Sequence, residues 1–149
     1  MTHIDPAVAG DAAAVTACVR AAYAEHVAAI GREPAPMAAD YARLIAEGAV
    51  WVARDGARIV GVLVVRPRPP ELLLENVAVA PDRRGQGLGR TLIACAEEHA
   101  RQAGFEAVAL YTNARMTANL RLYPALGYRE TGRATEEGFP RVHYRKGVR

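Results

Sequence analysis

A glycine-rich segment at residues 83–89 carries the strongest chemical signal in this sequence. It reads Arg-Arg-Gly-Gln-Gly-Leu-Gly and lies between an apolar run and a stretch with helical spacing of apolar residues. Glycines in such a turn let the backbone approach a ligand closely and gather its N–H groups into one concavity. The helix that follows would add free N–H groups and the positive end of its dipole. The segment therefore predicts a phosphate-binding loop, to which Arg84 and Arg90 would add charge-assisted contacts.

The spacing of the glycines argues against two common nucleotide-binding motifs. A dinucleotide fingerprint, G-x-G-x-x-G, that begins at Gly85 and Gly87 would need glycine at position 90, where the sequence has Arg90. A Walker A loop would end in Gly-Lys followed by Ser or Thr, and this segment has no such ending. Both motifs therefore fail, and another phosphate-bearing ligand is expected.

The loop resembles the Arg/Gln-x-x-Gly-x-Gly/Ala signature of the GNAT superfamily of N-acetyltransferases, here Arg84-x-x-Gly87-x-Gly89. The preceding segment 75–81 (ENVAVAP) is similar to that family's central strand, and segment 116–128 is similar to its later tyrosine-bearing helix and strand. The similarity is close over residues 72–133 and only topological before them. It implies an enzyme that uses acetyl-coenzyme A as acyl donor and passes the acetyl group to an amine by direct attack.

The resemblance assigns most of the expected donor contacts to backbone groups. It implies a bulge in the central strand, where the N–H of Val77 would stabilise the oxygen that becomes negative while Ala78 and Val79 pair with the pantetheine amides. Asn119 would hydrogen-bond the donor or the central strand, although it fits equally well as a surface asparagine. The residues expected at the phosphates of coenzyme A are Arg84, Gly85, Gln86, Gly87, Leu88, Gly89 and Arg90.

Two side chains are expected to move protons. Tyr123 occupies the position of the family's proton donor to the departing thiolate, but Pro124 follows it and disfavours helical dihedrals at Tyr123. A kink there could present the hydroxyl to the donor or displace it, and the sequence leaves both outcomes open. Glu75 is the best candidate for the general base, because a glutamate in an apolar strand is costly unless it is satisfied or functional. It could equally pair with an arginine.

The acceptor amine is not legible in the sequence beyond a small molecule or a peptide. Tyr23, Glu25 and His26 fall in the first expected helix, near the expected acceptor side, and segment 30–37 is predicted to wall the acceptor pocket. Two other functions remain open. A tRNA-directed acetyltransferase toxin would need a denser basic patch, so a nucleic-acid partner is not favoured, and a non-catalytic acyl-CoA sensor would lack a proton donor such as Tyr123.

The elements that must position these residues form the order βααβββαβαββ, which predicts an α/β (α+β) fold with a mixed sheet of about six or seven strands and helices on both faces. Asp55-Gly56 is a strong hairpin signal, and the run 72–80 (LLLENVAVA) has the pattern of a strand buried on both faces. Asp11 is expected to cap the first helix. The expected strands are 2–4, 50–54, 58–66, 72–80, 105–112, 128–133 and 141–146, and the expected helices are 12–30, 38–47, a helix from the glycine loop to about 102, and 117–126.

Composition sets the remaining limits. The 149 residues suit a single domain over 1–149, and the net charge of +3 is too mild to identify a partner. The four histidines show no metal-ligand spacing, so no metal is expected, and the two cysteines, Cys18 and Cys95, are expected as reduced core residues. No apolar run approaches the ~20 residues of a membrane span. A cytoplasmic location is expected, with a homodimer left open.

Overall fold

The computed structural model describes residues 2–149, and its strands form one seven-stranded sheet in the order β1-β2-β3-β4-β5-β7-β6. Neighbouring strands are antiparallel except β4 and β5, which run parallel. The predicted mixed sheet is therefore confirmed. The strands are β1 (Thr2–Pro6), β2 (Val50–Asp55), β3 (Arg58–Arg68), β4 (Glu71–Val79), β5 (Ala107–Asn113), β6 (Arg129–Glu136) and β7 (Phe139–Gly147).

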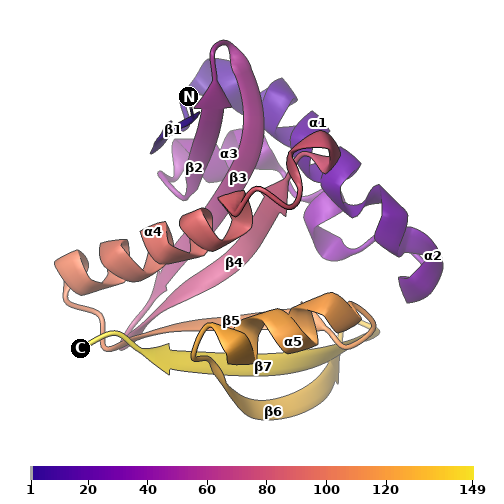
Figure 1. Cartoon of the computed structure of the whole chain (residues 1–149), viewed down its shortest axis with the longest axis vertical. Helices are drawn as coiled ribbons and strands as arrows, with labels where there is room; N and C mark the ends of the chain where they lie inside the picture. Colours follow the sequence, from indigo (N-terminus) through magenta and orange to yellow (C-terminus); the bar gives the residue numbers. More distant parts are fainter. Residues whose placement is uncertain (1) are drawn as a thin grey trace.

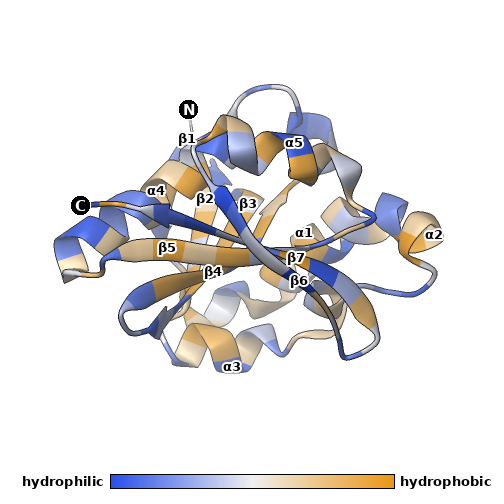
Figure 2. Cartoon of the chain, turned by 90° about the horizontal axis from the view of Figure 1, so that it is seen from below, coloured by the Kyte–Doolittle hydropathy of each residue, from blue (hydrophilic) through white to orange (hydrophobic). Residues whose placement is uncertain are grey.

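Helices cover both faces of the sheet (Figures 1 and 2). One face of β3 and β4 packs against α1, and α4 packs against β3, β4 and β5 from the other face. α5 lies on the same side as α4, beside β6 (Figure 2). The helices are α1 (Ala12–Tyr23), α2 (Val27–Ile30), α3 (Tyr41–Ala46), α4 (Leu88–Ala103) and α5 (Thr117–Ala125).

Helix α4 has the apolar stripe that its sequence spacing predicts. Leu92, Ala96 and Ala100 recur at intervals of four residues and are completely buried against the sheet. Gly61 of β3 makes this close packing possible, because a Cβ there would lie only 3.1 Å from the Leu92 side chain. The helix ends at Gly104, whose φ of +86° favours glycine. The glycine loop that precedes α4 is thus held on a firmly packed helix.

Strand β4 is paired along its whole length on one side and only at its start on the other. It pairs with β5 over Glu71–Leu74 alone, and the two strands then diverge, as the opening between them in Figure 1 shows. The pairing of β4 with β3 shifts register so that Val65 pairs with Leu74 while Val64 pairs with Asn76. Glu75 is therefore the extra residue of a bulge at the point where β4 and β5 separate.

The prediction that the β4 run is buried on both faces is wrong for alternate residues. Leu74, Asn76 and Ala78 are buried, whereas Val77 and Val79 are only half-buried. An apolar strand is buried on both faces only where other protein elements cover both faces. One face of β4 instead borders the opening beside β5.

The helical segments before β2 differ from the prediction. The expected helix over 12–30 is broken by a 3-10 turn at Ala24–His26, so that only α1 and the single turn of α2 are α-helical. The expected helix over 38–47 is reduced to α3, which follows a 3-10 turn at Ala35–Ala38 and is capped by Asp40. Asp11 occupies the N-cap position of α1 as predicted, but its side chain makes no capping hydrogen bond to that helix: the carboxylate accepts a hydrogen bond from the Val8 N–H at 2.8 Å and pairs with Arg54.

Candidate active site

A cleft of about 510 Å³ lies beside the part of β4 that β5 leaves unpaired. Its walls come from β4 between Leu74 and Val79, from the glycine loop with the first turns of α4, from the end of α1, and from α5. The divergence of β4 and β5 thus creates a hollow that ends at the loop singled out by the sequence.

The glycine loop has the backbone conformation that its sequence predicts. Gly85 and Gly87 have φ values of +79° and +82°, a region that other residues rarely adopt, and α4 begins at Leu88. A Cβ at either glycine would meet no other atom of the described residues within 4 Å, so conformation rather than space requires glycine here. The loop and the free N–H groups of the first turn of α4 border the cleft, where they can bind an anion.

Arg84 is tied to the end of helix α1 and to the 3-10 turn that follows it. Its guanidinium forms an ion pair with Glu25 and donates a hydrogen bond to the Ala22 carbonyl oxygen at 2.8 Å. The side chain borders the cleft but is already partnered. A phosphate bound at the loop would have to share Arg84 with Glu25 or displace it.

Most of the other predicted donor-binding residues also border the cleft. They are Val77, Ala78, Val79, Leu88, Gly89, Arg90 and Asn119. Asn119 donates a hydrogen bond to the Thr112 hydroxyl at 3.0 Å, and so connects α5 to β5 rather than to the central strand. Gln86 is the exception, because it is exposed and borders a separate small hollow beside β1.

Tyr123 reaches the cleft despite the proline that follows it. Helix α5 continues through Pro124, and the Tyr123 ring is buried against the rings of Tyr128 and Tyr144 at centroid distances of 5.7 and 5.8 Å. Burial raises the pKa of the Tyr123 phenol to about 12. Its hydroxyl forms no hydrogen bond with any of residues 2–149, although the side chain borders the cleft. The phenol is therefore protonated at neutral pH and has no partner to which it must donate.

Glu75 stands at the bulge of β4. Its Oε2 lies 3.0 Å from Nε of Arg66 on β3, in an ion pair whose geometry is not that of a hydrogen bond. The Glu75 side chain is 31 % exposed, which leaves it in contact with both the cleft and a second pocket on the other side of the opening. The sequence left two roles open for Glu75, and the arginine pairing is one that the structure shows.

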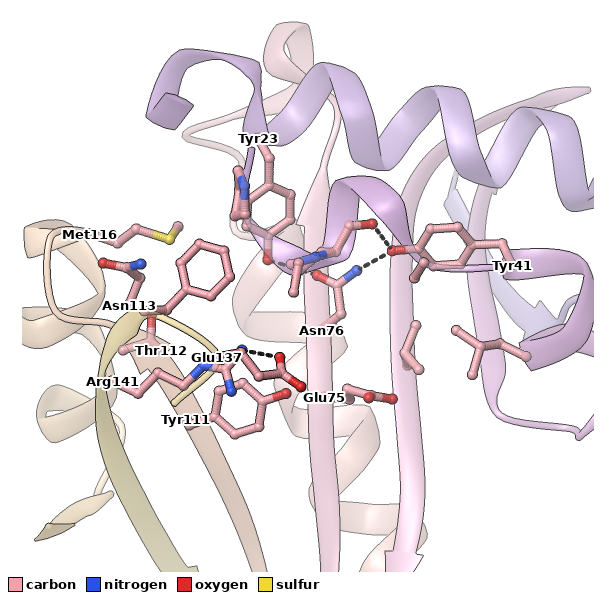
Figure 3. A pocket seen from close by; sticks show the side chains of 17 residues that line it. Tyr23, Tyr41, Glu75, Asn76, Tyr111, Thr112, Asn113, Met116, Glu137 and Arg141 are labelled. Atoms are coloured by element: carbon pink, nitrogen blue, oxygen red, sulfur yellow. Dashed lines mark hydrogen bonds and ion pairs between the residues drawn. The ribbon is translucent and has the colours of Figure 1, made fainter. Parts of the chain in front are cut away.

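The second pocket, of about 280 Å³, lies between β4, β5, the β6–β7 hairpin and the segment before α3 (Figure 3). Segment 34–36 forms part of its wall, together with aromatic rings and charged side chains. The pocket and the cleft share five lining residues: Tyr23, Glu75, Asn76, Thr112 and Met116. The two hollows therefore meet where β4 and β5 separate.

A chain of hydrogen bonds crosses this meeting point (Figure 3). The Tyr41 hydroxyl donates to the Pro36 carbonyl oxygen at 2.6 Å, and Nδ2 of Asn76 donates to the Tyr41 oxygen at 3.0 Å. The Tyr23 hydroxyl then donates to Oδ1 of Asn76 at 2.7 Å. Because a carbonyl can only accept, the direction of every bond in the chain is fixed. The Tyr23 oxygen is left as an acceptor at the junction of the two hollows.

Sequence reasoning missed Asn76, Tyr41 and the pocket-lining Arg141. Asn76 had a usable signal, because a buried amide inside an apolar run needs hydrogen-bond partners. Tyr41 and Arg141 are separated from it by 35 and 65 positions, and no local pattern connects them to the same pocket.

Residues 2–149 contain no helix that is long and apolar enough to cross a membrane. The same part of the chain holds no group of three or more His, Cys, Asp or Glu side chains placed to bind a metal ion.

The sheet order, the divergence of β4 from β5 and the glycine loop together define the class of α/β acetyltransferases. The family model described as "Acetyltransferase (GNAT) family" matches residues 16–128, and the chain belongs to this family. The resemblance drawn from residues 72–133 is thereby confirmed.

Curated relatives match part of the chain. A rat protein named N-acetyltransferase family 8 member 2 is 33% identical over 95 residues, which cover 60% of this chain and 42% of the rat protein. A Xenopus laevis protein named probable N-acetyltransferase camello is 36% identical over 84 residues, which cover 54% of this chain and 38% of that protein. The chain thus spans about two-fifths of the length of these relatives.

Solved structures match almost the whole chain. The PaiA N-acetyltransferase of Thermoplasma acidophilum, solved with coenzyme A, has a TM-score of 0.84 at 15% identity and covers 99% of both chains. A ribosomal-protein-alanine N-acetyltransferase of Brucella melitensis has a TM-score of 0.76 at 25% identity, over 97% of this chain and 99% of that one. At such identities the likeness establishes the GNAT fold.

Proposed function

We propose that this chain is an N-acetyltransferase that moves the acetyl group of acetyl-coenzyme A to the amine of a small molecule or a peptide. The observation that carries the proposal is that the two hollows meet at the polar side chains of Tyr23, Glu75 and Asn76. One hollow ends in an anion-binding loop, and the other is a small pocket with aromatic and charged walls. A thioester and an amine that enter from opposite sides would meet at this junction.

The cleft offers groups that fit coenzyme A. The glycine loop and the first turn of α4 would hold the phosphates, and the unpaired edge of β4 would bind the pantetheine amides as an added strand would. The Tyr23 hydroxyl lies 3.4 Å from the Val77 carbonyl oxygen, which supports an orientation of that carbonyl toward the cleft. In an extended strand the N–H of the same residue points the same way. The Val77 N–H is thus a suitable donor to the thioester oxygen as negative charge develops on it.

Tyr23 is suited to orient the acceptor amine. Its hydroxyl proton is committed to Asn76, so its oxygen can only accept a further hydrogen bond, and an amine N–H is a matching donor. The chain through Asn76 and Tyr41 ends on the Pro36 carbonyl, in the segment that walls the second pocket. Acceptor binding against this segment would therefore be coupled to the position of the Tyr23 hydroxyl.

Glu75 and Tyr123 would handle the two protons of the reaction. An amine is mostly protonated at neutral pH and must lose a proton before it attacks, and Glu75 is the carboxylate that borders both hollows. The Tyr123 phenol, protonated and without a hydrogen-bond partner among the described residues, would donate to the departing thiolate. Burial raises the pKa of the Tyr123 phenol, and it would also raise the pKa of a thiol in the same cleft. The pKa difference that opposes proton transfer would therefore be smaller than the difference between the buried phenol and a thiol in water.

The test is coenzyme A release from acetyl-coenzyme A with a panel of amines and no added nucleic acid. We expect turnover with at least one amine, and we expect Gly87→Val to abolish measurable binding of acetyl-coenzyme A. Valine at φ +82° is strained and forces the loop into another conformation. Binding is measured by calorimetry, and circular dichroism establishes that the variant is folded.

Gly104→Val is a matched control. Gly104 also has a positive φ, of +86°, but it lies at the far end of α4 from the loop. This variant should lose a similar amount of stability and keep its affinity for acetyl-coenzyme A. Equal affinity in wild type and a folded Gly87→Val variant would contradict the assignment of the donor site.

A further inference from the structure

Arg141 is a nearly buried cation in the wall of the second pocket. It lies on β7, its side chain is only 10 % exposed, and its guanidinium carbon stands 4.4 Å from the centroid of the Tyr111 ring. The centroid of the Phe139 ring is 5.6 Å away. Figure 3 shows the side chain between Tyr111 and Glu137, at the edge of the pocket. Both ring centroids lie within cation–π distance of the guanidinium carbon.

The Arg141 guanidinium contacts carboxylates and aromatic rings but makes no hydrogen bond within the described part of the chain. A guanidinium carries five N–H donors, and within residues 2–149 none of those of Arg141 makes a hydrogen bond. Its ion pairs are long, 3.8 Å to Glu136 and 3.5 Å to Glu137. Other arginines of this chain do form close contacts with carboxylates, such as the two 2.7 Å hydrogen bonds from Arg58 to Asp82. A guanidinium that is largely covered, lines a pocket and makes no hydrogen bond within residues 2–149 is suited to pair with an anion in that pocket.

Neither glutamate is placed to be that partner. Glu136 already contacts His143 at 2.9 Å. Glu137 is 75 % exposed and belongs to the β6–β7 turn, where its φ of +54° is unusual for a residue other than glycine. An ion pair whose carboxylate is this exposed and lies 3.5 Å away is weakened by solvent and contributes little. A bound ligand could therefore take the donors of Arg141 without breaking a strong interaction.

We infer that the acceptor carries a carboxylate, and that Arg141 binds this group while the amine lies at Tyr23 and Glu75. The inference rests on the proposed acetyltransfer, and it specifies the class of acceptor as a small amino acid or a similar amino-carboxylate. Planar fork-to-fork pairing suits a guanidinium and a carboxylate. The rings of Tyr111 and Phe139 offer apolar surface to the rest of the molecule.

The test compares amino acids of varied side chain with their own amides as acceptors. The wild-type enzyme should show a lower KM for the acid than for the amide of a pair. Arg141→Gln should raise the KM for the acid by about 10- to 100-fold, the loss expected for a charge-assisted pair, while the amide changes less than threefold. The ratio of the KM for the acid to the KM for the amide is compared between wild type and variant, because the different basicities of the two amines affect this ratio equally in both proteins.

Arg133→Gln is the matched control, because Arg133 lies on the neighbouring strand β6, is 59 % exposed and, among residues 2–149, pairs only with Glu130. It should leave the ratio unchanged. An unchanged ratio in Arg141→Gln, or an equal rise in KM for acid and amide, would overturn the inference. A lower KM for an aminoalkyl phosphonate than for its carboxylate analogue would also overturn the inference.

A binding experiment separates this inference from the proposed function. In the presence of coenzyme A, N-acetyl amino acids are titrated against wild type and Arg141→Gln, with the N-acetyl amino-acid amides as comparison. Tighter binding of the acids that disappears in the variant supports the carboxylate site even if no amine is turned over, in which case only the proposed reaction fails. Equal binding of acids and amides to the wild-type protein would overturn the inference even if turnover is observed.

Discussion

The replacement Tyr123→Phe tests the mechanism with little disturbance of the fold. It keeps the ring that packs against Tyr128 and Tyr144 and removes only the hydroxyl. That hydroxyl makes no hydrogen bond with residues 2–149, so the usual loss of roughly 0.5–1.5 kcal/mol for a hydrogen bond does not apply. The free energy of unfolding should therefore change by less than about 0.5 kcal/mol. Denaturation in urea, followed by circular dichroism, measures this change.

The effect on the reaction should be much larger. General acid catalysis contributes roughly 10²–10⁴-fold, which corresponds to about 2.7–5.4 kcal/mol in the barrier. We expect a fall of that size in the rate of acetyl transfer, with an unchanged dissociation constant for acetyl-coenzyme A. The rate is measured in single turnovers with saturating enzyme, because slow product release could otherwise hide the chemical step.

Tyr144→Phe is the control for the loss of a tyrosine hydroxyl in this aromatic cluster. Tyr144 contacts the Tyr123 ring but does not border the cleft, so its variant should react at the wild-type rate. If Tyr123→Phe also reacts within threefold of wild type, another group protonates the thiolate, and Tyr123 serves only to pack α5 against the sheet.

Two further predictions concern stability. Gly61→Ala should lower the free energy of unfolding by about 1–2 kcal/mol, because its Cβ would lie 3.1 Å from the Leu92 side chain; an unchanged urea midpoint would show that α4 shifts without strain. Alkaline pH should also destabilise the protein, because burial raises the pKa of Tyr123 to about 12 and burial with the Glu97 carboxylate raises that of Tyr128. The folded state then holds protons that the unfolded chain loses near pH 10, so stability is full below pH 10 and falls above it, by about 1.4 kcal/mol per pH unit for each such tyrosine. Melting temperatures between pH 8 and 11.5 measure this fall, which should be shallower in Tyr123→Phe, and equal slopes in both proteins would contradict it.

Local signals determined most of the fold. The Asp55-Gly56 hairpin, the glycine loop before α4 and the apolar stripe of α4 all lie where the sequence predicts them. Each rests on an interaction between residues only a few positions apart, such as a turn that needs a positive φ or an apolar residue at every fourth position. Such patterns are complete within the sequence, and the backbone has few ways to satisfy them.

The first helical region shows where local signals were insufficient. The alanine-rich run from Ala12 to Ile30 has the composition of one helix, yet the chain changes to a 3-10 turn at Ala24–His26. At this point Tyr23 bonds to Asn76 and Glu25 pairs with Arg84, and both partners lie more than 50 positions away. Tertiary contacts of this kind outweigh the small differences in helix propensity between neighbouring residues.

By itself, then, the sequence determined the class of ligand-binding loop, the order of the elements and the family, because these depend on short spacings. Only the tertiary structure decided that Glu75 is the bulged residue and pairs with Arg66, that Tyr123 reaches the cleft despite Pro124, and that the cleft and the second pocket meet. The second pocket takes its walls from segment 34–36, β4, β5 and the β6–β7 hairpin. Side chains from segments so far apart in the chain become neighbours only through the pairing order of the strands, which no local pattern specifies.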